Sequence, residues 1–387
     1  MSNQPPSEVP QGAIRFNTDS QRMEFFAQDR WYEFLTDDTS GTGGRAFRVG
    51  GPGTIIETFN IATEGNGVDT GFDLSVGGGF GGSSSAHAGS RTRAVIAGGS
   101  DGGSNNTIQF FNMASLSNSI DFGDTTRGVY RCGGASNNTR MVTAGQASGS
   151  DNTMELIIIP SLGNAVDFGD LHTTMELPKA CASPTRALFA GGDDNGDGNP
   201  VNNNIQFCTI ASTGNALDFG DLTRVVTGYD CACGSPVRML HAGGKPVTYE
   251  AMIDYFGIAS KGNALDFGDL TIRKNNSTGV SNNTRGVWCR GELADGVNVT
   301  SCDYVTIAST GNASDFGNIS EGRYAGGASN QVRGVIVGGF KSPGSYNTNI
   351  EYITIPTAGN AIDFGEDIVS RYSHSGLSDS HGGLGGY

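Results

Sequence analysis

The sequence has no apolar run near the roughly 20 residues that a membrane-spanning helix needs, so we expect no insertion into a membrane. No secretory signal peptide is recognisable, and we expect no secretion by that route. Basic residues are few: 24 Lys and Arg against 39 Asp and Glu give a formal net charge of −15. Since no basic patch is present to contact phosphates, we expect no nucleic acid as a partner.

Motifs that carry catalysis are also missing. The sequence contains no GxSxG, and its Gly-Gly pairs end strand-like stretches instead of opening a helix as a phosphate loop does. A copper centre of the galactose-oxidase type would need two His and two Tyr with a linked Cys, and nothing marks such a set. The histidines are scattered, without HxH or HExxH: His87, His172, His241, His374 and His381. We therefore predict no enzyme and no cofactor.

The cysteines form no paired CxxC set, and their number is odd. Several stand where other parts of a repeated pattern have Gly or Ala. We interpret them as small buried apolar residues with free thiols, in keeping with assembly in a reducing cytoplasm. They are Cys132, Cys181, Cys208, Cys231, Cys233, Cys289 and Cys302.

One repeated segment organises the chain. Its clearest copy reads CTIASTGNALDFGDLT and ends at Thr223, and the copies follow one another at intervals of about 46 to 52 residues. Glycine is abundant, 61 of 387 residues, and recurs beside β-branched residues, which favours short strands and tight turns. The leading aspartates of the seven copies are Asp69, Asp121, Asp167, Asp218, Asp266, Asp315 and Asp363.

Each repeat has four short strand candidates, a pattern typical of a β-propeller. The first is rich in small residues, as expected near a crowded central axis. We predict an all-β fold with a seven-bladed β-propeller over residues 45–387. The first repeat begins at its second strand, and residues 371–378 supply the missing first strand, which closes the ring and leaves no open edge.

The order of apolar-Gly-Gly, an aromatic strand, a later aromatic and Arg resembles the kelch repeat. Phe would replace the Trp of that family at Phe122, Phe168, Phe219, Phe267, Phe316 and Phe364. The resemblance implies four-stranded blades in a kelch-like β-propeller.

An arginine also recurs in the repeats, at Arg93, Arg140, Arg186, Arg238, Arg285 and Arg333. A ring of ligand-binding charges is one interpretation. We favour a structural one, in which each Arg pairs with a repeated Asp within or between blades, because a binding site rarely needs six equal copies.

The turns between strands one and two and between strands three and four are nearly uniform and lie on one face, here called the constant face. The loops between strands two and three lie on the opposite, variable face, where binding residues are expected. Candidates there are Asp194, Lys245, Tyr249, Glu292, Asp295, Lys341 and Tyr346. A glycan-degrading enzyme would need paired carboxylates among these loops, and no pair can be identified.

The loop that starts at Asp193 begins like a calcium loop, with oxygen ligands at Asp193, Asn195 and Asp197. Position twelve is Asn204 instead of the closing Glu. We therefore favour an ordinary Asp- and Gly-rich turn over a calcium site.

A separate element precedes the repeats. Residues 1–12 form an extended arm, residues 13–34 a small three-stranded β-meander and residues 35–44 a linker. So short a meander cannot bury its own aromatic side chains. We expect it to serve as an attachment element through Phe16, Phe25, Phe26, Trp31, Tyr32 and Phe34.

The meander resembles a short element near the start of tailed-phage tail-fibre and other virion proteins, with Gly12, Arg15, Phe16, Asn17, Thr18, Glu24 and Trp31 in matching order. The DFGD repeats likewise resemble those of structural proteins of marine and cyanobacterial phages. The resemblance implies a virion protein, assembled in the host cytoplasm, that contacts other virion proteins through residues 1–40. Its propeller would bind a glycan or protein on the host surface. Alternative functions are a purely structural adaptor or spacer that links other virion proteins and, least favoured, a glycan-degrading enzyme. For residues 1–40, the alternative to a different virion protein as partner is self-association into a homo-oligomer.

Overall fold

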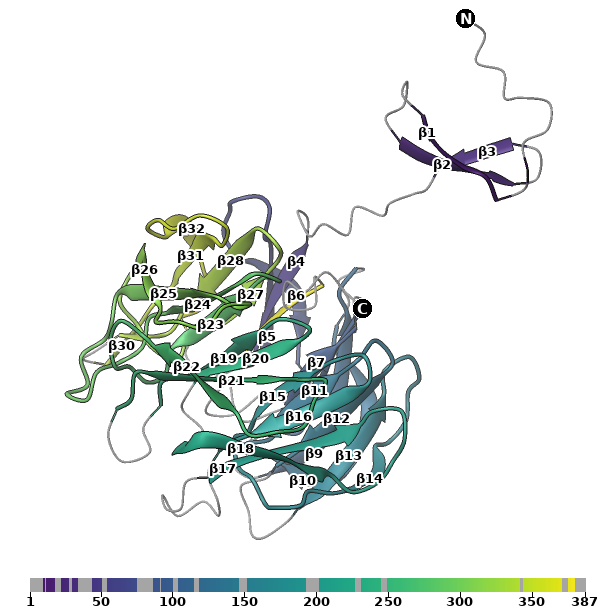
Figure 1. The fold of residues 1–387 in the computed structure, drawn as a ribbon, viewed down its shortest axis with the longest axis horizontal. Coiled ribbons are helices and arrows are strands. Elements are labelled where there is room, and N and C mark those ends of the chain that lie inside the picture. Colours follow the sequence, from purple (N-terminus) through teal and green to yellow (C-terminus); the bar gives the residue numbers. More distant parts are fainter. Residues whose placement is uncertain are drawn as a thin grey trace, which may run out of the picture. The chain divides into compact units, whose positions relative to one another are not determined.

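The computed structural model describes residues 10, 12–17, 22–27, 30–33, 44–50, 54–74, 86–90, 92–99, 104–114, 118–145, 152–192, 202–226, 231–244, 249–341, 344–370 and 375–379. The chain divides into two compact units, Met1–Ser40 and Gly41–Tyr387, which we describe separately (Figure 1).

The first unit is an antiparallel meander of β1 (Ile14–Asn17), β2 (Arg22–Ala27) and β3 (Arg30–Glu33). On one face, Arg15 binds Glu24 at 2.7 Å and lies over the ring of Trp31, which meets Phe26 edge to face. The other face carries Ile14, whose side chain is 59% exposed.

For four of the six predicted attachment residues, the structure does not describe the side chain. Phe34 and the side chains of Phe16, Phe25 and Tyr32 lie outside the described residues. The backbone register nevertheless places Ile14, Phe25 and Tyr32 side by side across the three strands. Since alternate residues of a strand share a face, the aromatic positions do not all belong to the side that Arg15 and Glu24 occupy.

The second unit is a seven-bladed β-propeller, as predicted. Each blade is an antiparallel four-stranded sheet in which the first strand lies innermost. Blade 1 contains β33 (Ser375–Ser378), β4 (Arg45–Val49), β5 (Ile55–Asn60) and β6 (Val68–Asp73). Blade 2 contains β7 (Ala86–Gly89), β8 (Arg93–Ala97), β9 (Asn105–Asn112) and β10 (Ile120–Val129). Blade 3 contains β11 (Gly133–Ser136), β12 (Arg140–Ala144), β13 (Thr153–Ile158) and β14 (Val166–Asp170).

The remaining blades follow the same plan. Blade 4 contains β15 (Lys179–Ala182), β16 (Arg186–Ala190), β17 (Asn202–Thr209) and β18 (Leu217–Val226). Blade 5 contains β19 (Cys231–Gly234), β20 (Arg238–Ala242), β21 (Met252–Gly257) and β22 (Leu265–Asp269). Blade 6 contains β23 (Thr278–Ser281), β24 (Arg285–Cys289), β25 (Ser301–Thr306) and β26 (Ser314–Asn318). Blade 7 contains β27 (Gly326–Ser329), β28 (Arg333–Val337), β31 (Asn349–Thr354) and β32 (Ile362–Glu366), with the hairpin β29 (Phe340–Lys341) and β30 (Ser345–Tyr346) in its variable loop.

The C-terminal strand closes the ring, which confirms that prediction for the described residues 375–378. β33 pairs with β4, Ser378 opposite Ala46, so that blade 1 combines the two ends of the repeat region. Residues 371–374 of the predicted strand lie outside the described residues. The hydroxyl of Ser378 also donates to the carbonyl of Ser329 at 3.0 Å, which ties the closing strand to blade 7.

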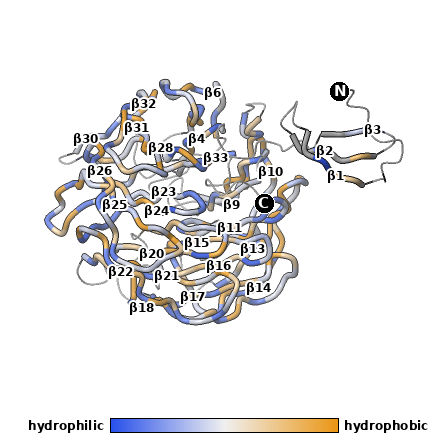
Figure 2. The backbone as a smooth tube through the Cα atoms, turned by 45° about the horizontal axis from the view of Figure 1, so that its top comes forward, coloured by the Kyte–Doolittle hydropathy of each residue, from blue (hydrophilic) through white to orange (hydrophobic). Residues whose placement is uncertain are grey.

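The hydrophobic core lies between blades instead of inside a single layer. Each cluster of buried side chains in the described part of the chain combines two neighbouring blades. The Phe of the DFG segment is almost fully buried in six blades. In five of them it meets an aromatic ring of the third strand, such as Phe207 with Phe219 at 5.6 Å. Apolar stretches accordingly recur in every blade along the chain (Figure 2).

Candidate functional site

The repeated segment is used to join blades. In six interfaces, the Gly of the turn between strands three and four donates its amide to the Phe carbonyl of the preceding DFG, at 2.6–2.9 Å. The neighbouring Asn accepts from the residue after that DFG at 2.9–3.2 Å. These contacts pair the outermost strand of each blade with the next blade, so its edge is covered. The uniformity of the constant face is thus explained by internal contacts.

The repeating arginines are structural, but their predicted partners were wrong. Each donates to main-chain carbonyls at the end of the third strand of the next blade, at 2.7–3.2 Å, and Arg45 completes the ring in blade 1. In five blades the guanidinium also lies 4.3–4.9 Å from the centroid of an aromatic ring. The aspartates instead accept the amide of the Gly two residues later, at 2.8–3.1 Å in six blades. The repeated Arg and Asp side chains therefore both form hydrogen bonds with main-chain atoms. Their spacing along the sequence could not reveal these partners.

Replacing Arg285 with alanine is therefore expected to lower the free energy of unfolding by about 1–3 kcal/mol, since two interactions with the neighbouring blade are removed. Its guanidinium donates to the carbonyl of Ile355 at 3.1 Å and lies 4.7 Å from the Tyr304 ring centroid. Urea unfolding of the variant measures the change. Unchanged stability would contradict the structural role.

A second polar ring was not predicted from the sequence. The third strand of every blade carries one acidic or Gln residue that is buried or nearly so: Glu57, Gln109, Glu155, Gln206, Asp254, Asp303 and Glu351. In several blades it accepts a backbone amide from the link after the preceding blade, as Gln206 does from Thr173 at 3.0 Å. Five of the acids also pair with a buried or partly buried cation. The sequence did contain a signal for this ring, because one polar residue recurs at the same place in the third strand of every blade.

On the variable face, the structure brings two predicted binding residues together. The hydroxyl of Tyr249, from the loop of blade 5, donates to Oε1 of Glu292 in blade 6 at 3.3 Å. Glu292 also accepts from Asn276 at 2.8 Å and forms an ion pair with Arg323. Burial raises the pKa of Tyr249, and the charge of Glu292 adds to this effect. Both residues are largely buried, so they hold the loops and do not face solvent.

The loops of blades 6 and 7 lie beside each other. The Nδ2 of Asn298 donates to the carbonyl of Phe340 at 3.4 Å, and Arg323 lies 4.7 Å from the centroid of the Phe340 ring. Below them, the fully buried Arg290 pairs with Glu351 at 2.7 Å. Buried charged pairs of this kind position the loops closely, because moving one partner leaves an unpaired charge in the interior.

The exposed side chains of these loops include Tyr346, Val297 and Asp295. Tyr346 is 45% exposed and meets Phe340 with ring centroids 5.9 Å apart. Val297 is 53% exposed, and Asp295 is exposed beside it. Lys341 is half-buried in β29. We call residues 292–300, 340–341 and 344–348 the loop ridge. An aromatic, an aliphatic and an acidic group on a firmly held support form a surface suited to binding.

Asp193, Asp194, Asn195, Asp197 and Lys245 lie outside the described residues, so both the calcium-loop prediction and two of the binding residues stay predictions. Within the described part of the chain, no group of three or more His, Cys, Asp or Glu is arranged to hold a metal ion.

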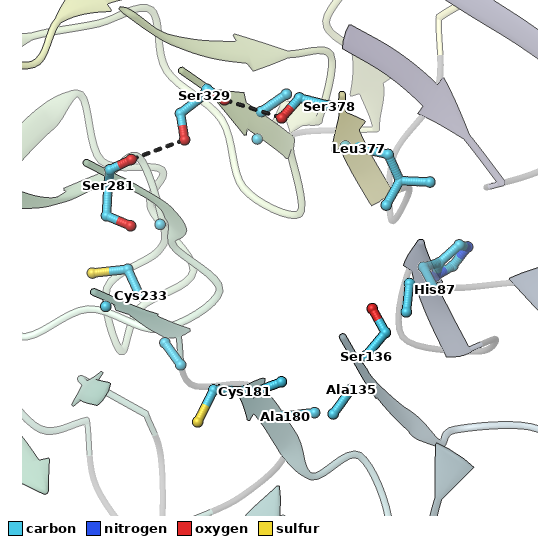
Figure 3. A pocket seen from close by; sticks show the side chains of 18 of the residues that line it. His87, Ala135, Ser136, Ala180, Cys181, Cys233, Ser281, Ser329, Leu377 and Ser378 are labelled. Atoms are coloured by element: carbon cyan, nitrogen blue, oxygen red, sulfur yellow. Dashed lines mark hydrogen bonds between the residues drawn. The ribbon is translucent and has the colours of Figure 1, made fainter. Parts of the chain in front are cut away.

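The axis of the propeller contains a cavity of about 340 Å³ (Figure 3). All seven innermost strands line it, mostly with Gly, Ala and Ser, and Figure 3 shows the chain of hydrogen bonds from Ser378 through Ser329 to Ser281. His87 stands at a position where four other blades have Gly. The hydroxyls thus join blades, and the cavity offers little charge to a ligand.

The prediction of free thiols was wrong for two cysteines. Cys289 and Cys302 lie opposite each other on β24 and β25 and form a disulfide. Thirteen residues of sequence separate them, and only the strand register brings them together. The other five, Cys132, Cys181, Cys208, Cys231 and Cys233, take part in no disulfide within the described part of the chain.

The free thiols are expected to react slowly in the folded protein. Burial raises the pKa of Cys132, Cys181 and Cys208 to about 12, so almost none of each is thiolate at pH 8. Iodoacetamide labelling followed by mass spectrometry should show five labels after unfolding without reductant and seven after reduction. Seven labels without reductant would contradict the disulfide.

No protein-family model matches the chain, and no curated protein matches it. The described part contains no helix of the length and apolarity that crossing a bilayer requires. The structure therefore establishes a seven-bladed β-propeller, a fold compatible with binding or structural roles.

Proposed function

We propose that this chain is a bacteriophage virion protein, a tail fibre, appendage or capsid fibre, that binds the host surface through the loop ridge. The observation that carries the proposal is the contrast between the two faces. Repeated residues of the constant face are used in blade-to-blade contacts, whereas the loop ridge is held by buried ion pairs and presents Tyr346, Val297 and Asp295. The kelch-like character of the repeats and the phage origin rest on the sequence resemblances.

In this proposal the protein is not an enzyme and needs no cofactor. It is assembled in the host cytoplasm and attached to other virion proteins through residues 1–40, without nucleic acid or membrane insertion. The ligand is a glycan or a protein at the cell surface. On the described face of the meander, Trp31 and Phe26 lie beside the ion pair of Arg15 with Glu24, and Ile14 is exposed on the other face. We assign attachment to the aromatic residues of this meander.

Binding of the labelled full-length protein to a panel of marine cyanobacterial strains tests the host-binding role. Tyr346→Ala and Val297→Ser are each expected to weaken binding at least tenfold to any strain that the unaltered protein binds. Val237→Ser is the matched control, because Val237 is 65% exposed but lies in the turn between β19 and β20, on the constant face. Equal loss in all three variants, or binding to no strain, would contradict the assignment of the loop ridge.

Attachment is tested by incorporation into particles. A chain that starts near Gly43 should fold as a propeller but should be missing from purified virions, as measured by quantitative mass spectrometry. Normal copy number of the truncated chain would show that residues 1–40 are not the anchor. Crosslinking of the full-length protein distinguishes an oligomer formed through these residues from a contact with a different virion protein.

A further inference from the structure

Within the repeated segment, one position has no evident use inside the propeller. In the copy KGNALDFGD that ends at Asp269, the Gly and Asn bind the preceding blade, the Ala and Phe are buried, and the first Asp accepts the amide of the Gly two residues later. The remaining position precedes the Asp, and we call its seven occurrences the rim positions. They are Val68, Ile120, Val166, Leu217, Leu265, Ser314 and Ile362.

Six of the seven rim positions carry aliphatic side chains that are 45–59% exposed. Single exposed aliphatics are common on protein surfaces and need no explanation. Here, however, the exposure recurs at the same place in six blades, at the start of the outermost strand just after the turn of the constant face. The rim positions therefore form a ring around the perimeter of that face.

Packing within the blade does not account for this ring. The rim residue lies opposite a large side chain of the third strand in several blades, as Leu217 lies opposite Phe207. In blade 6 the corresponding pair is Ser314 and Tyr304, and β26 keeps the same pairing with β25 as its equivalents. A blade therefore forms without an aliphatic residue at this position.

The charged residues next to the rim positions indicate which kind of partner can bind there. Each rim position is followed by an exposed Asp of the repeated segment, so the ring alternates apolar and negative groups. In six blades one oxygen of this carboxylate accepts the amide of the Gly two residues later, which holds the acid in place at the residue that follows the rim position. A second copy of the same face would bring like charges together, which disfavours self-association. A partner with apolar side chains next to Lys or Arg would meet both features.

We propose that the rim positions and their aspartates form an interaction surface for a polypeptide partner whose apolar side chains alternate with basic ones. The surface is independent of the loop ridge and lies on the opposite face. Each contact is small, but the repetition around the ring lets one extended or symmetric partner engage several blades at once. Linked contacts of this kind raise the overall affinity well above that of a single contact.

The test uses the full-length protein and a fluorescent peptide of four Leu-Lys repeats, with Ser-Lys and Leu-Glu peptides of equal length. Fluorescence anisotropy should show binding of the Leu-Lys peptide only. The combined variant Val166→Ser, Leu217→Ser, Leu265→Ser and Ile362→Ser copies the residue found naturally in blade 6. It should keep its melting temperature and weaken this binding at least tenfold, while Ser314→Leu should strengthen it.

A second variant controls for general stickiness. Val237→Ser and Ile368→Ser together remove exposed aliphatics that lie outside both the rim positions and the loop ridge, with exposures of 65% and 47%. This variant should bind the Leu-Lys peptide as the unaltered protein does. Equal weakening in both variants, equal binding of the Ser-Lys peptide, or no binding of the Leu-Lys peptide would overturn the proposal. None of these outcomes depends on host binding, so failure here is distinguishable from failure of the proposed function.

Discussion

Replacing Lys274 with methionine is expected to lower the free energy of unfolding by about 3–5 kcal/mol, as for the loss of one partner of a buried ion pair. Lys274 lies in the link between blades 5 and 6, and its ammonium pairs with Asp303 at 2.8 Å. Both side chains are fully buried. The ammonium also donates to the carbonyls of Trp288 and Ser301, at 3.0 and 3.3 Å. Burial lowers the pKa of Lys274, and the charge of Asp303 opposes that shift.

The double variant Lys274→Met with Asp303→Leu is the control. Removing both charges leaves no unpaired carboxylate, so most of the lost stability should return. Chemical unfolding followed by Trp288 fluorescence measures all three proteins, because Trp288 is buried beside this pair. If the single and double variants were equally unstable, packing and not the unpaired charge would be the cause.

The variant Gly376→Ala is expected to disrupt closure of the ring. A Cβ atom at this position of β33 would lie 2.2 Å from the carbonyl oxygen of Gly327 in blade 7, closer than real Cβ contacts come. Because the obstacle is backbone in a neighbouring strand, rotation of a side chain cannot relieve it. Overpacking in a core typically costs 1–3 kcal/mol, and we expect about 3 kcal/mol or more for a backbone clash at the closing strand.

Gly359→Ala provides the matched control. A Cβ atom there meets nothing within 4 Å, and the residue does not have a positive φ. Its melting temperature should therefore stay within about 2 °C of the unaltered protein, as for a surface substitution. The backbone amides of β33 and β4 should exchange faster with solvent in Gly376→Ala than in the unaltered protein, but not in Gly359→Ala. Protected amides in these strands, together with an unchanged melting temperature, would contradict the role assigned to Gly376.

Much of the fold could be predicted because each blade repeats the same local instructions. The intervals between the repeated aspartates set the number of blades, and small residues in the first strands indicated the crowded axis that Gly327 and Gly376 now show. The strand left over at the C-terminus predicted the pairing with β4. These features depend on local patterning, turn chemistry and strand order, all of which the sequence displays directly.

The contacts between blades could not be predicted in the same way. Arg285 and Asp266 recur at fixed intervals, yet each binds backbone groups and not the other, as Arg285 does with the carbonyl of Ile355. Backbone groups are present at every residue, so no sequence pattern marks which of them is the partner. The disulfide between Cys289 and Cys302 likewise depended on register.

By itself, the sequence determined the all-β class, the number of blades, their strand order and the variable face. The tertiary structure decided which residues serve packing and which remain for a partner. Tyr249 and Glu292 became supports because the loops of blades 5 and 6 converge, while Tyr346 and Val297 stayed exposed. The rim positions emerged by the same reasoning, since only the contacts between blades show which residues of the repeated segment are already used. Local preferences set the strands, but burial and partner choice depend on residues that are distant in the sequence.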